Sequence, residues 1–353
     1  MSEVNQQLIA DRLGLSRATV SRCFTNHAGI SPVTRAKVFQ VAAEIGYTHM
    51  ESRSPQAAKP SRGRRLCVLI CTYAEEYFRG GYQSPGEQIL AGVSEYAQAH
   101  DFKVDVHLIP PDVTSLDDAP FREIGGISRR AFGGVLLIYP FPEPVIEQLA
   151  LRFPLVSLVD QLEHGSIDCV DVDHYNGISM AVDHLVKEGH RRIGFYTKAY
   201  AVEASWSLRR YSAFVEKMAR LKMKLSPRDV IGVFPRPVLP VPQSIEAAVD
   251  RTRDGVTGWV CAADHQAYDM IRGFSDHGLK VPKDVSVTGF DGIERTRSSP
   301  DLTTVRIPYR EIGMTGAERL AARLRKRFQG KQHVYISGQL HEGRTVEPPV
   351  SSE

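Results

Sequence analysis

The first fifty residues carry apolar side chains at helical spacing, interrupted by short polar turns. Asn5 can cap a helix through residues 8–13, and Gly14 supplies the backbone freedom that ends this helix. Ser16 can cap a second helix over residues 17–24. The pattern therefore predicts two short helices joined by a tight turn.

A third helix is predicted to follow. Ser31 is its capping residue, Pro32 takes the first position, where a missing N–H costs nothing, and Gly46 ends it. Val38 and Val41 belong to its apolar stripe. Two helices about a turn, braced by a third, make a helix-turn-helix that reads DNA. A plain three-helix bundle without a ligand is the alternative.

From Leu66 onward the pattern changes to short apolar runs that alternate with amphipathic helices. Strands are predicted at residues 66–71, 103–109, 133–139, 154–160, 192–197, 258–263 and 285–292, and helices at 85–100, 177–190, 208–222 and 268–278. This alternation indicates parallel sheets with helices on both faces, and its length suits two lobes.

The predicted organisation is an all-α head at residues 1–48, a linker at 49–65 and an α/β two-lobed domain at 66–350. The linker is polar and basic and contains Pro55 and Pro60, a composition that cannot bury a core.

Charge is unevenly distributed between these parts. Residues 1–65 hold ten Lys and Arg against four acids, whereas the remainder holds 34 basic and 37 acidic residues. A small basic head on a slightly acidic body is typical of a nucleic-acid-binding module attached to another domain.

Composition narrows the class of protein further. Hydrophobic residues make up 42% and charged residues 24% of the chain, values that exclude wholesale disorder. No apolar stretch is long enough for a membrane span, and the polar start is no secretory signal, so we expect a soluble, cytoplasmic protein. The five cysteines form no CxxC pair, so we expect small buried thiols and no metal.

The exposed face of the second helix supplies the candidate DNA-binding residues. Arginine can bond guanine bidentately, and hydroxyl groups suit phosphates or base edges. The candidates are Ser16, Arg17, Ala18, Thr19, Ser21, Arg22 and Asn26.

The head resembles the lactose repressor/galactose repressor family of bacterial transcription regulators. The residues that carry the resemblance are LIADRLGLSRATVSRCFTNHAGISPVTRAKVFQVAAEIGY. In the body, DHYNGISMAVDHLVKEGHRRIGFYT and VPKDVSVTGFDGIERTRSSPDLTTVRIPYREIG are similar to the family's effector-binding domain, itself similar to periplasmic sugar-binding proteins. The resemblance runs from about Gln7 to Arg344 and implies a DNA-binding head on a periplasmic-binding-protein-like domain.

Ligands of open parallel sheets collect at the carboxyl ends of strands, and the resemblance adds further positions there. The candidate effector-binding residues from strand ends are Thr72, Tyr139, Asp160, Asp264 and Asp291, and those implied by the resemblance alone are Tyr77, Phe78 and Arg210. Carboxylates and arginine suit polyols, because each makes paired, charge-assisted hydrogen bonds with neighbouring hydroxyl groups.

Some of these positions have structural alternatives or depart from the family. Asp173 and Asn176 are interpreted as helix caps, and Asp291 can equally hold a turn. The linker lacks the family's minor-groove leucine, and Ala263 replaces an asparagine that the family usually has.

The resemblance and the charge pattern together predict a ligand-responsive transcription regulator. We expect a repressor that binds a pseudo-palindromic operator in double-stranded DNA as a homodimer and responds to an effector between its lobes. A sugar or related polyol is the expected effector, with a purine as the competitor. A sugar-processing enzyme with an accessory DNA-binding head is the alternative, but the chain has no GxSxG, P-loop, HExxH or dinucleotide-binding motif, and we expect no cofactor.

Overall fold

The computed structural model describes most of the chain. The described residues are 5–24, 27, 29–45, 47, 64–73, 84–162, 167–198, 205–233, 239–293, 299–326 and 330–350. The chain divides into two compact units, Met1–Asp171 with Tyr309–Val334 and Val172–Pro308 with Tyr335–Glu353.

The head consists of three helices, α1 (Gln6–Leu13), α2 (Arg17–Phe24) and α3 (Pro32–Glu44). The residues predicted to cap and end the first helix do so in the structure. Asn5 Oδ1 accepts from the backbone N–H groups of Gln7 and Leu8, and Gly14 ends α1 in the left-handed region at φ 63°. The helices therefore begin and end where the sequence predicts, and Gly46, the predicted end of α3, lies outside the described residues.

The apolar face of each helix enters one small core. Val20 and Val38 are fully buried in it, and Phe24, Leu15 and Ile45 pack against it. The predicted stripes thus form the shared interior of the head, leaving the opposite face of α2 in solvent.

The first sheet has the strand order β11-β5-β4-β3-β1-β2. Its strands are β1 (Arg65–Cys71), β2 (Lys103–Ile109), β3 (Gly134–Ile138), β4 (Leu155–Leu158), β5 (Asp168–Val172) and β11 (His333–Ile336). The associated helices are α5 (Pro85–Ala99), α6 (Ala119–Glu123), α7 (Gly125–Ser128), α8 (Glu143–Ala150) and α13 (Tyr309–Leu324). The β1, β2, β3, β4 and β5 pairings are parallel, as the alternating pattern predicts.

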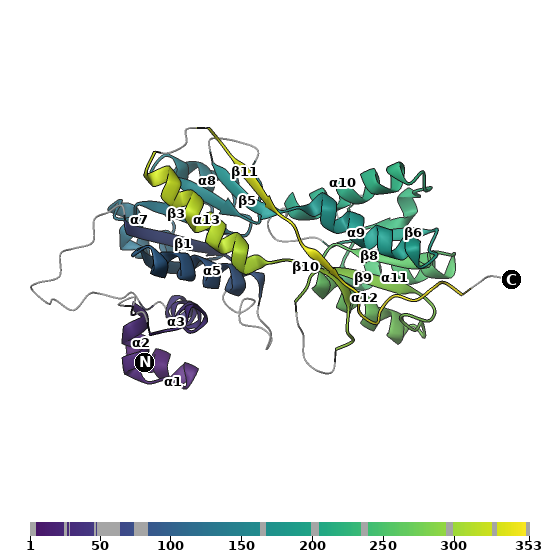
Figure 1. The fold of residues 1–353 in the computed structure, drawn as a ribbon, viewed down its shortest axis with the longest axis horizontal. Helices are drawn as coiled ribbons and strands as arrows, with labels where there is room; N and C mark the ends of the chain where they lie inside the picture. The colour runs from purple at the N-terminus through teal and green to yellow at the C-terminus, as the bar shows by residue number, and fades with distance from the viewer. Residues whose placement is uncertain are drawn as a thin grey trace, which may run out of the picture. The chain divides into compact units, whose positions relative to one another are not determined.

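Two glycines let α5 and α13 pack very closely side by side (Figure 1). A Cβ atom on Gly92 would lie 1.9 Å from the carbonyl oxygen of Arg310, and one on Gly313 would lie 2.0 Å from that of Ile89. Each helix therefore places a glycine against the backbone of the other, and neither position has room for a side chain.

The second sheet has the order β12-β10-β9-β8-β6-β7. Its strands are β6 (Ile193–Tyr196), β7 (Val230–Ile231), β8 (Gly258–Cys261), β9 (Ser286–Asp291), β10 (Thr303–Arg306) and β12 (Gln339–His341), of which β12 runs antiparallel to β10. The helices are α9 (His174–Lys187), α10 (Ser205–Arg220), α11 (Val241–Arg253) and α12 (Asp264–Asp276), with a 3₁₀ turn at Pro227–Asp229.

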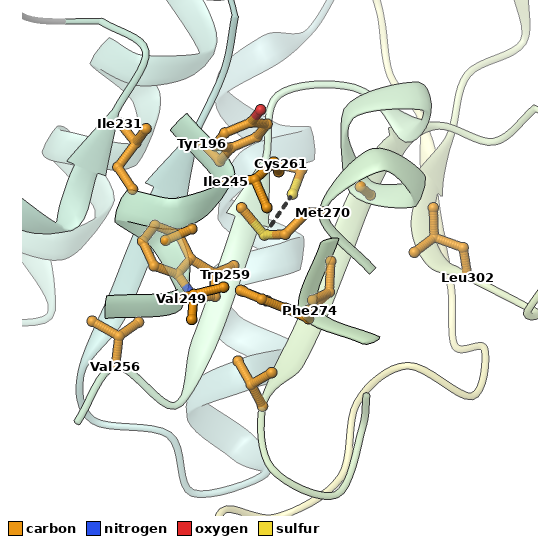
Figure 2. Close-up of a cluster of buried hydrophobic side chains, with 14 residues drawn as sticks. Tyr196, Ile231, Ile245, Val249, Val256, Trp259, Cys261, Met270, Phe274 and Leu302 are labelled. Carbon is orange, nitrogen blue, oxygen red and sulfur yellow. Dashed lines mark hydrogen bonds between the residues drawn. The ribbon is translucent and has the colours of Figure 1, made fainter. Parts of the chain in front are cut away.

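Alternate residues of this sheet face opposite helical layers. Phe195 on β6 packs against Tyr211 and Phe214 of α10. Its neighbour Tyr196 enters the cluster shown in Figure 2, where Trp259 of β8 meets side chains of α11 and α12. The predicted two-faced burial of parallel strands is confirmed here.

The C-terminal segment beyond β12 runs back along the second unit. Thr345 Oγ1 donates to the Val287 carbonyl at 2.7 Å, and the Ser286 hydroxyl bonds the Glu347 carbonyl at 3.1 Å. His190, fully buried, bonds Thr257 Oγ1 and the Glu347 carbonyl at 2.9 and 3.1 Å. This histidine joins the segment to the sheet.

Several elements were not predicted from the sequence. These are α6, α7, α8, α11, α13, β5, β7, β10, β11 and β12. The helix predicted from residue 177 begins at His174, and Asp173 caps it by accepting from the Asn176 N–H at 3.0 Å. The cap prediction is therefore confirmed for Asp173, whereas Asn176 lies inside the helix.

All five cysteines are buried and free, as expected.

Candidate functional site

The exposed face of α2 presents four of the predicted DNA-binding residues. Ser16, Arg17, Ala18 and Arg22 are exposed, and Thr19 is half-buried, as is Ser21. Ser16 Oγ accepts from the Thr19 N–H at 3.1 Å and bonds the Thr19 hydroxyl at 2.9 Å. Ser16 and Thr19 therefore fix the start of the helix, whereas the two arginines extend from it. Asn26 lies outside the described residues.

Arg35 of α3 holds the segment that follows α2. Its side chain is only 1% exposed, and Nη2 donates to the His27 carbonyl at 2.9 Å. Burial lowers the pKa of Arg35, and burial also raises the pKa of the neighbouring Cys23 thiol to about 11, so this thiol stays neutral. The sequence interpretation missed Arg35, because a lone arginine on a helix is usually a surface residue.

Three predicted effector residues lie at the carboxyl edge of the first sheet. Thr72 follows β1, Tyr139 follows β3 and Asp160 lies just beyond β4. The Tyr139 hydroxyl accepts from the Gly86 N–H at the start of α5 at 2.7 Å, and Asp160 is only 5% exposed. Tyr77 and Phe78, predicted beside them, lie outside the described residues.

The backbone at this edge is strained. Tyr139 has φ 71° and Val159 has φ 59°, values in the left-handed region that a β-branched residue rarely adopts. Such conformations persist only when the surrounding structure enforces them, and they concentrate at ligand sites.

The second unit brings together three further predicted residues: Arg210, Asp264 and Asp291. Arg210, on α10, donates from Nη1 to Asp291 Oδ1 at 3.1 Å and to the Ala262 carbonyl. Its guanidinium carbon lies 3.8 Å from the ring centroid of Phe290 and 4.7 Å from that of Trp206. The arginine is therefore oriented by a carboxylate and by two aromatic faces.

Asp264 completes this group at the start of α12. Its Oδ1 accepts from the Thr304 hydroxyl at 2.5 Å, and its Oδ2 accepts from the Ile293 N–H at 2.7 Å. Burial, and then repulsion from Asp291, raise the pKa of Asp264 to about 7, while the two hydrogen bonds oppose the rise. The carboxyl edge of the second sheet therefore holds two neighbouring carboxylates and one guanidinium.

Asp291 has a backbone role as well as a side-chain contact, and its predicted contact with an effector stays a prediction. It lies at the end of β9 with φ 125°, and its carbonyl accepts from the Ile307 N–H at 3.1 Å, so its backbone continues the pairing of β9 with β10. Its side chain binds Arg210 at the same time.

Three residues of this group were missed from the sequence. His174 Nδ1 accepts from Arg210 Nε at 3.3 Å, which requires a ring whose proton is on the other nitrogen. Trp206 lies one helical turn before Arg210, ahead of the predicted helix start, and Phe290 directly precedes Asp291. Gly177 of α9 makes room for Phe290, because a Cβ there would lie 2.5 Å from the ring.

The described part of the chain contains no group of three or more His, Cys, Asp or Glu side chains that could hold a metal ion. Among the same residues, no helix is long and apolar enough to cross a membrane.

Comparison with known proteins assigns both parts of the chain. Residues 7–49 match bacterial regulatory proteins of the lacI family, and residues 182–346 match the periplasmic binding protein-like domain. The HTH-type transcriptional repressor CytR of Escherichia coli K12 is 26% identical over 318 residues, which cover 86% of this chain and 85% of CytR.

Solved structures share the fold at 20% sequence identity. A complex of the transcriptional regulator CelR with cellobiose has a TM-score of 0.67 and covers 97% of this chain and 99% of its own. A lac repressor dimer bound to operator and the anti-inducer ONPF has a TM-score of 0.64 and covers 96% and 98%, respectively.

The fold and the matches define a protein with a helix-turn-helix DNA-binding domain joined to a two-lobed periplasmic-binding-protein-like domain. More particularly, the DNA-binding domain is of the lacI family of bacterial regulatory proteins, and this match, with that of the periplasmic binding protein-like domain, confirms the resemblance of the sequence.

Proposed function

We propose that this protein is a transcriptional repressor without catalytic activity, acting in the cytoplasm. It binds a pseudo-palindromic operator as a homodimer. Its affinity for the operator changes when a sugar-like effector binds the α/β domain. The observation that carries the proposal is the exposed face of α2, which presents Arg17 and Arg22 on a helix-turn-helix of the lacI family.

The recognition step follows from the geometry of the head. A helix of this length fits the major groove, where arginine can bond guanine O6 and N7 as a pair. Ser16 and Thr19 fix the start of α2, and Arg35 fixes the segment after it. The reading face is thus held rigid from both ends, and Ala18 adds a small apolar surface suited to a thymine methyl group.

A homodimer is the simplest way to read a pseudo-palindrome. Two copies related by a twofold axis place two heads on half-sites about one helical turn apart. The lac repressor structure that shares this fold is described as a dimer bound to operator, which supports the same assembly here.

The effector is assigned to the group around Arg210, Asp264 and Asp291. A polyol presents vicinal hydroxyl groups that can donate to carboxylates and accept from a guanidinium. Trp206 is half-buried and offers an aromatic ring of the kind that stacks on a sugar, whereas Phe290 is fully buried and orients Arg210. The related fold of CelR is described with cellobiose. The effector controls DNA binding only to the extent that it binds the two conformations of the protein with different affinity.

The test begins by selecting operator sequences from random duplexes with the purified full-length protein. Binding of the selected duplex is then titrated at two salt concentrations, with and without ribose, cellobiose and a purine nucleoside. Specific, salt-dependent binding that a sugar alters supports the proposal.

Three outcomes would contradict it. If the protein binds all duplexes equally, the proposed recognition of an operator sequence is wrong. If only the purine nucleoside alters DNA binding, the assignment of a sugar as effector is wrong. Turnover of a sugar without any effect on DNA binding favours the alternative, an enzyme with an accessory head. Sedimentation of the protein–duplex complex measures the number of copies bound.

A further inference from the structure

The two edges of the first sheet have different surroundings. β1, β2, β3, β4 and β5 run parallel, so they all begin at one edge and end at the other. The carboxyl edge carries Thr72, Tyr139 and Asp160. The amino edge is where the chain arrives from the head, because β1 begins at Arg65.

Cations gather along this amino edge. Arg65 is paired in register with Lys103 at the start of β2, and the Gly133 N–H donates to the Arg65 carbonyl at 2.7 Å, which places the segment containing Arg129 and Arg130 beside it. We call the whole set the basic rim: Arg64, Arg65, Lys103, Arg129, Arg130, Arg152, Arg325, Lys326 and Lys331.

The far end of the rim is fixed in the same way. The Val135 N–H donates to the Pro154 carbonyl at 3.0 Å, which brings the segment of Arg152 to the edge. The Cys169 N–H donates to the Gln332 carbonyl at 3.0 Å, so Lys331 lies at the start of β11. Arg325 and Lys326 follow the end of α13 in the same connection.

Few acids neutralise these charges. Asp101 pairs with Arg64, and Asp105 with Arg65. Asp168 is fully buried and already bonded by Arg319 and Arg323 of α13. Four exposed cations of the rim make no ion pair with a carboxylate of the described residues: Arg129, Arg130, Arg325 and Lys326.

The amino edge of the second sheet provides an internal comparison. Arg192 before β6 is paired with Asp229 at 2.9 Å and with Asp254 at 3.1 Å. Lys283 there is followed directly by Asp284. Two acids therefore neutralise Arg192 at this edge, in contrast to the four exposed cations of the basic rim that make no ion pair with a carboxylate of the described residues.

We propose that the basic rim binds the phosphate backbone of duplex DNA that flanks the site read by the head. The inference rests on the proposed operator binding and extends it to a second contact surface. The segment between Tyr47 and Arg64 spans at most about 60 Å even when fully extended, so the rim can reach a duplex that continues beyond the site held by the head. Exposed cations without carboxylate partners match a polyanion whose charges repeat regularly and carry no sequence information.

The experiment compares two duplexes and two matched triple variants of the full-length protein. The short duplex has about 20 base pairs, enough for two half-sites, and the long duplex extends the same site on both sides. The rim variant carries Arg129→Gln, Arg130→Gln and Lys326→Gln. The control variant carries Lys224→Gln, Arg228→Gln and Lys283→Gln, three exposed cations of the second unit.

The readout is the slope of the logarithm of the binding constant against the logarithm of salt concentration. Each phosphate contact contributes about 0.9 to that slope, so the rim variant loses about 2–3 per copy, or about 5 for a homodimer, on the long duplex and nothing on the short one. The control variant matches the wild type on both duplexes.

Two results contradict the proposal that the basic rim binds DNA. One is a salt-dependence slope of the wild type that is equal on the two duplexes while sequence preference is retained. The other is an equal loss in the rim and control variants. Loss of sequence preference on every duplex overturns the proposed function and the rim together, which distinguishes the two failures.

Discussion

Arg210 and Asp291 form a buried ion pair, with 3.1 Å between Nη1 and Oδ1 and side chains that are 4% and 9% exposed. The pair joins α10 to the end of β9. Because water cannot solvate either charge well, each ion depends on the other and on its hydrogen bonds. This arrangement keeps a guanidinium and a carboxylate at a fixed separation before any ligand arrives.

Removal of Arg210 is expected to affect both stability and the effector response. Arg210→Ala leaves the Asp291 carboxylate buried without its partner and lowers the free energy of unfolding by about 3–5 kcal/mol. Arg210→Lys retains the charge but not the planar fork, so it loses less stability and still loses the response to effector. Urea unfolding and operator titration with effector measure the two effects.

The control for this pair is Arg272→Ala on α12. Arg272 pairs with Asp269 at 3.3 Å, but its side chain is 68% exposed, so the expected cost is below about 1 kcal/mol. Equal destabilisation by Arg210→Ala and Arg272→Ala would show that burial does not govern the pair.

The stability of the protein should decrease as pH rises from about 4 to 7. The buried Asp264 has its pKa raised to about 7, above the 3.8 of an unperturbed aspartate, so the folded state binds a proton that the unfolded state has released. The stabilisation is present below pH 4 and is lost through pH 7, amounting to roughly 4 kcal/mol. Asp264→Asn, which cannot ionise, removes this component from the pH profile of unfolding.

The matched control is Asp276→Asn, at the exposed end of the same helix. Its pH profile should follow that of the wild type. A profile for Asp264→Asn that is parallel to the wild type between pH 4 and 7 would contradict a protonated Asp264.

Close packing of α5 and α13 should make two glycines irreplaceable. Gly92→Ala and Gly313→Ala each force a Cβ into a backbone carbonyl at about 2 Å, so the helices must separate, at a cost of about 1–3 kcal/mol or more. Thermal unfolding measures the loss. Gly330→Ala, at a position with open space around it, should be near neutral, and a similar loss there would point to a general effect of replacing glycine.

The head was predictable because its signals are local. Asn5 and Gly14 each act within a few residues of their own positions, and the structure places the helices where these residues imply. α13 was missed because its buried face includes Gly313 and Gly316, which weaken the apolar stripe. β5 was missed because its buried residues include Asp168 and Asp171, which interrupt an apolar run.

The candidate site was predictable in part. Asp264 and Asp291 could be predicted as site residues because they follow strands of a parallel sheet, whose topology alone brings such residues to one edge. The partner of Arg210 is 81 positions further along the chain, and His174 is 36 positions before it. No local pattern encodes these contacts, so the sequence offered the residues but not their pairing.

Substitution of the arginines on α2 should separate recognition from folding. Arg17→Ala and Arg22→Ala lie on the exposed face of the helix, away from the core around Val20, so thermal unfolding of the head should be unchanged. Each variant should lose about 1–3 kcal/mol of discrimination between the selected operator and a duplex altered at one base pair. Competition binding at fixed salt measures this difference, with Arg272→Ala as the control that removes one distant positive charge. Equal discrimination in both arginine variants and in the wild type would mean that another element reads the bases.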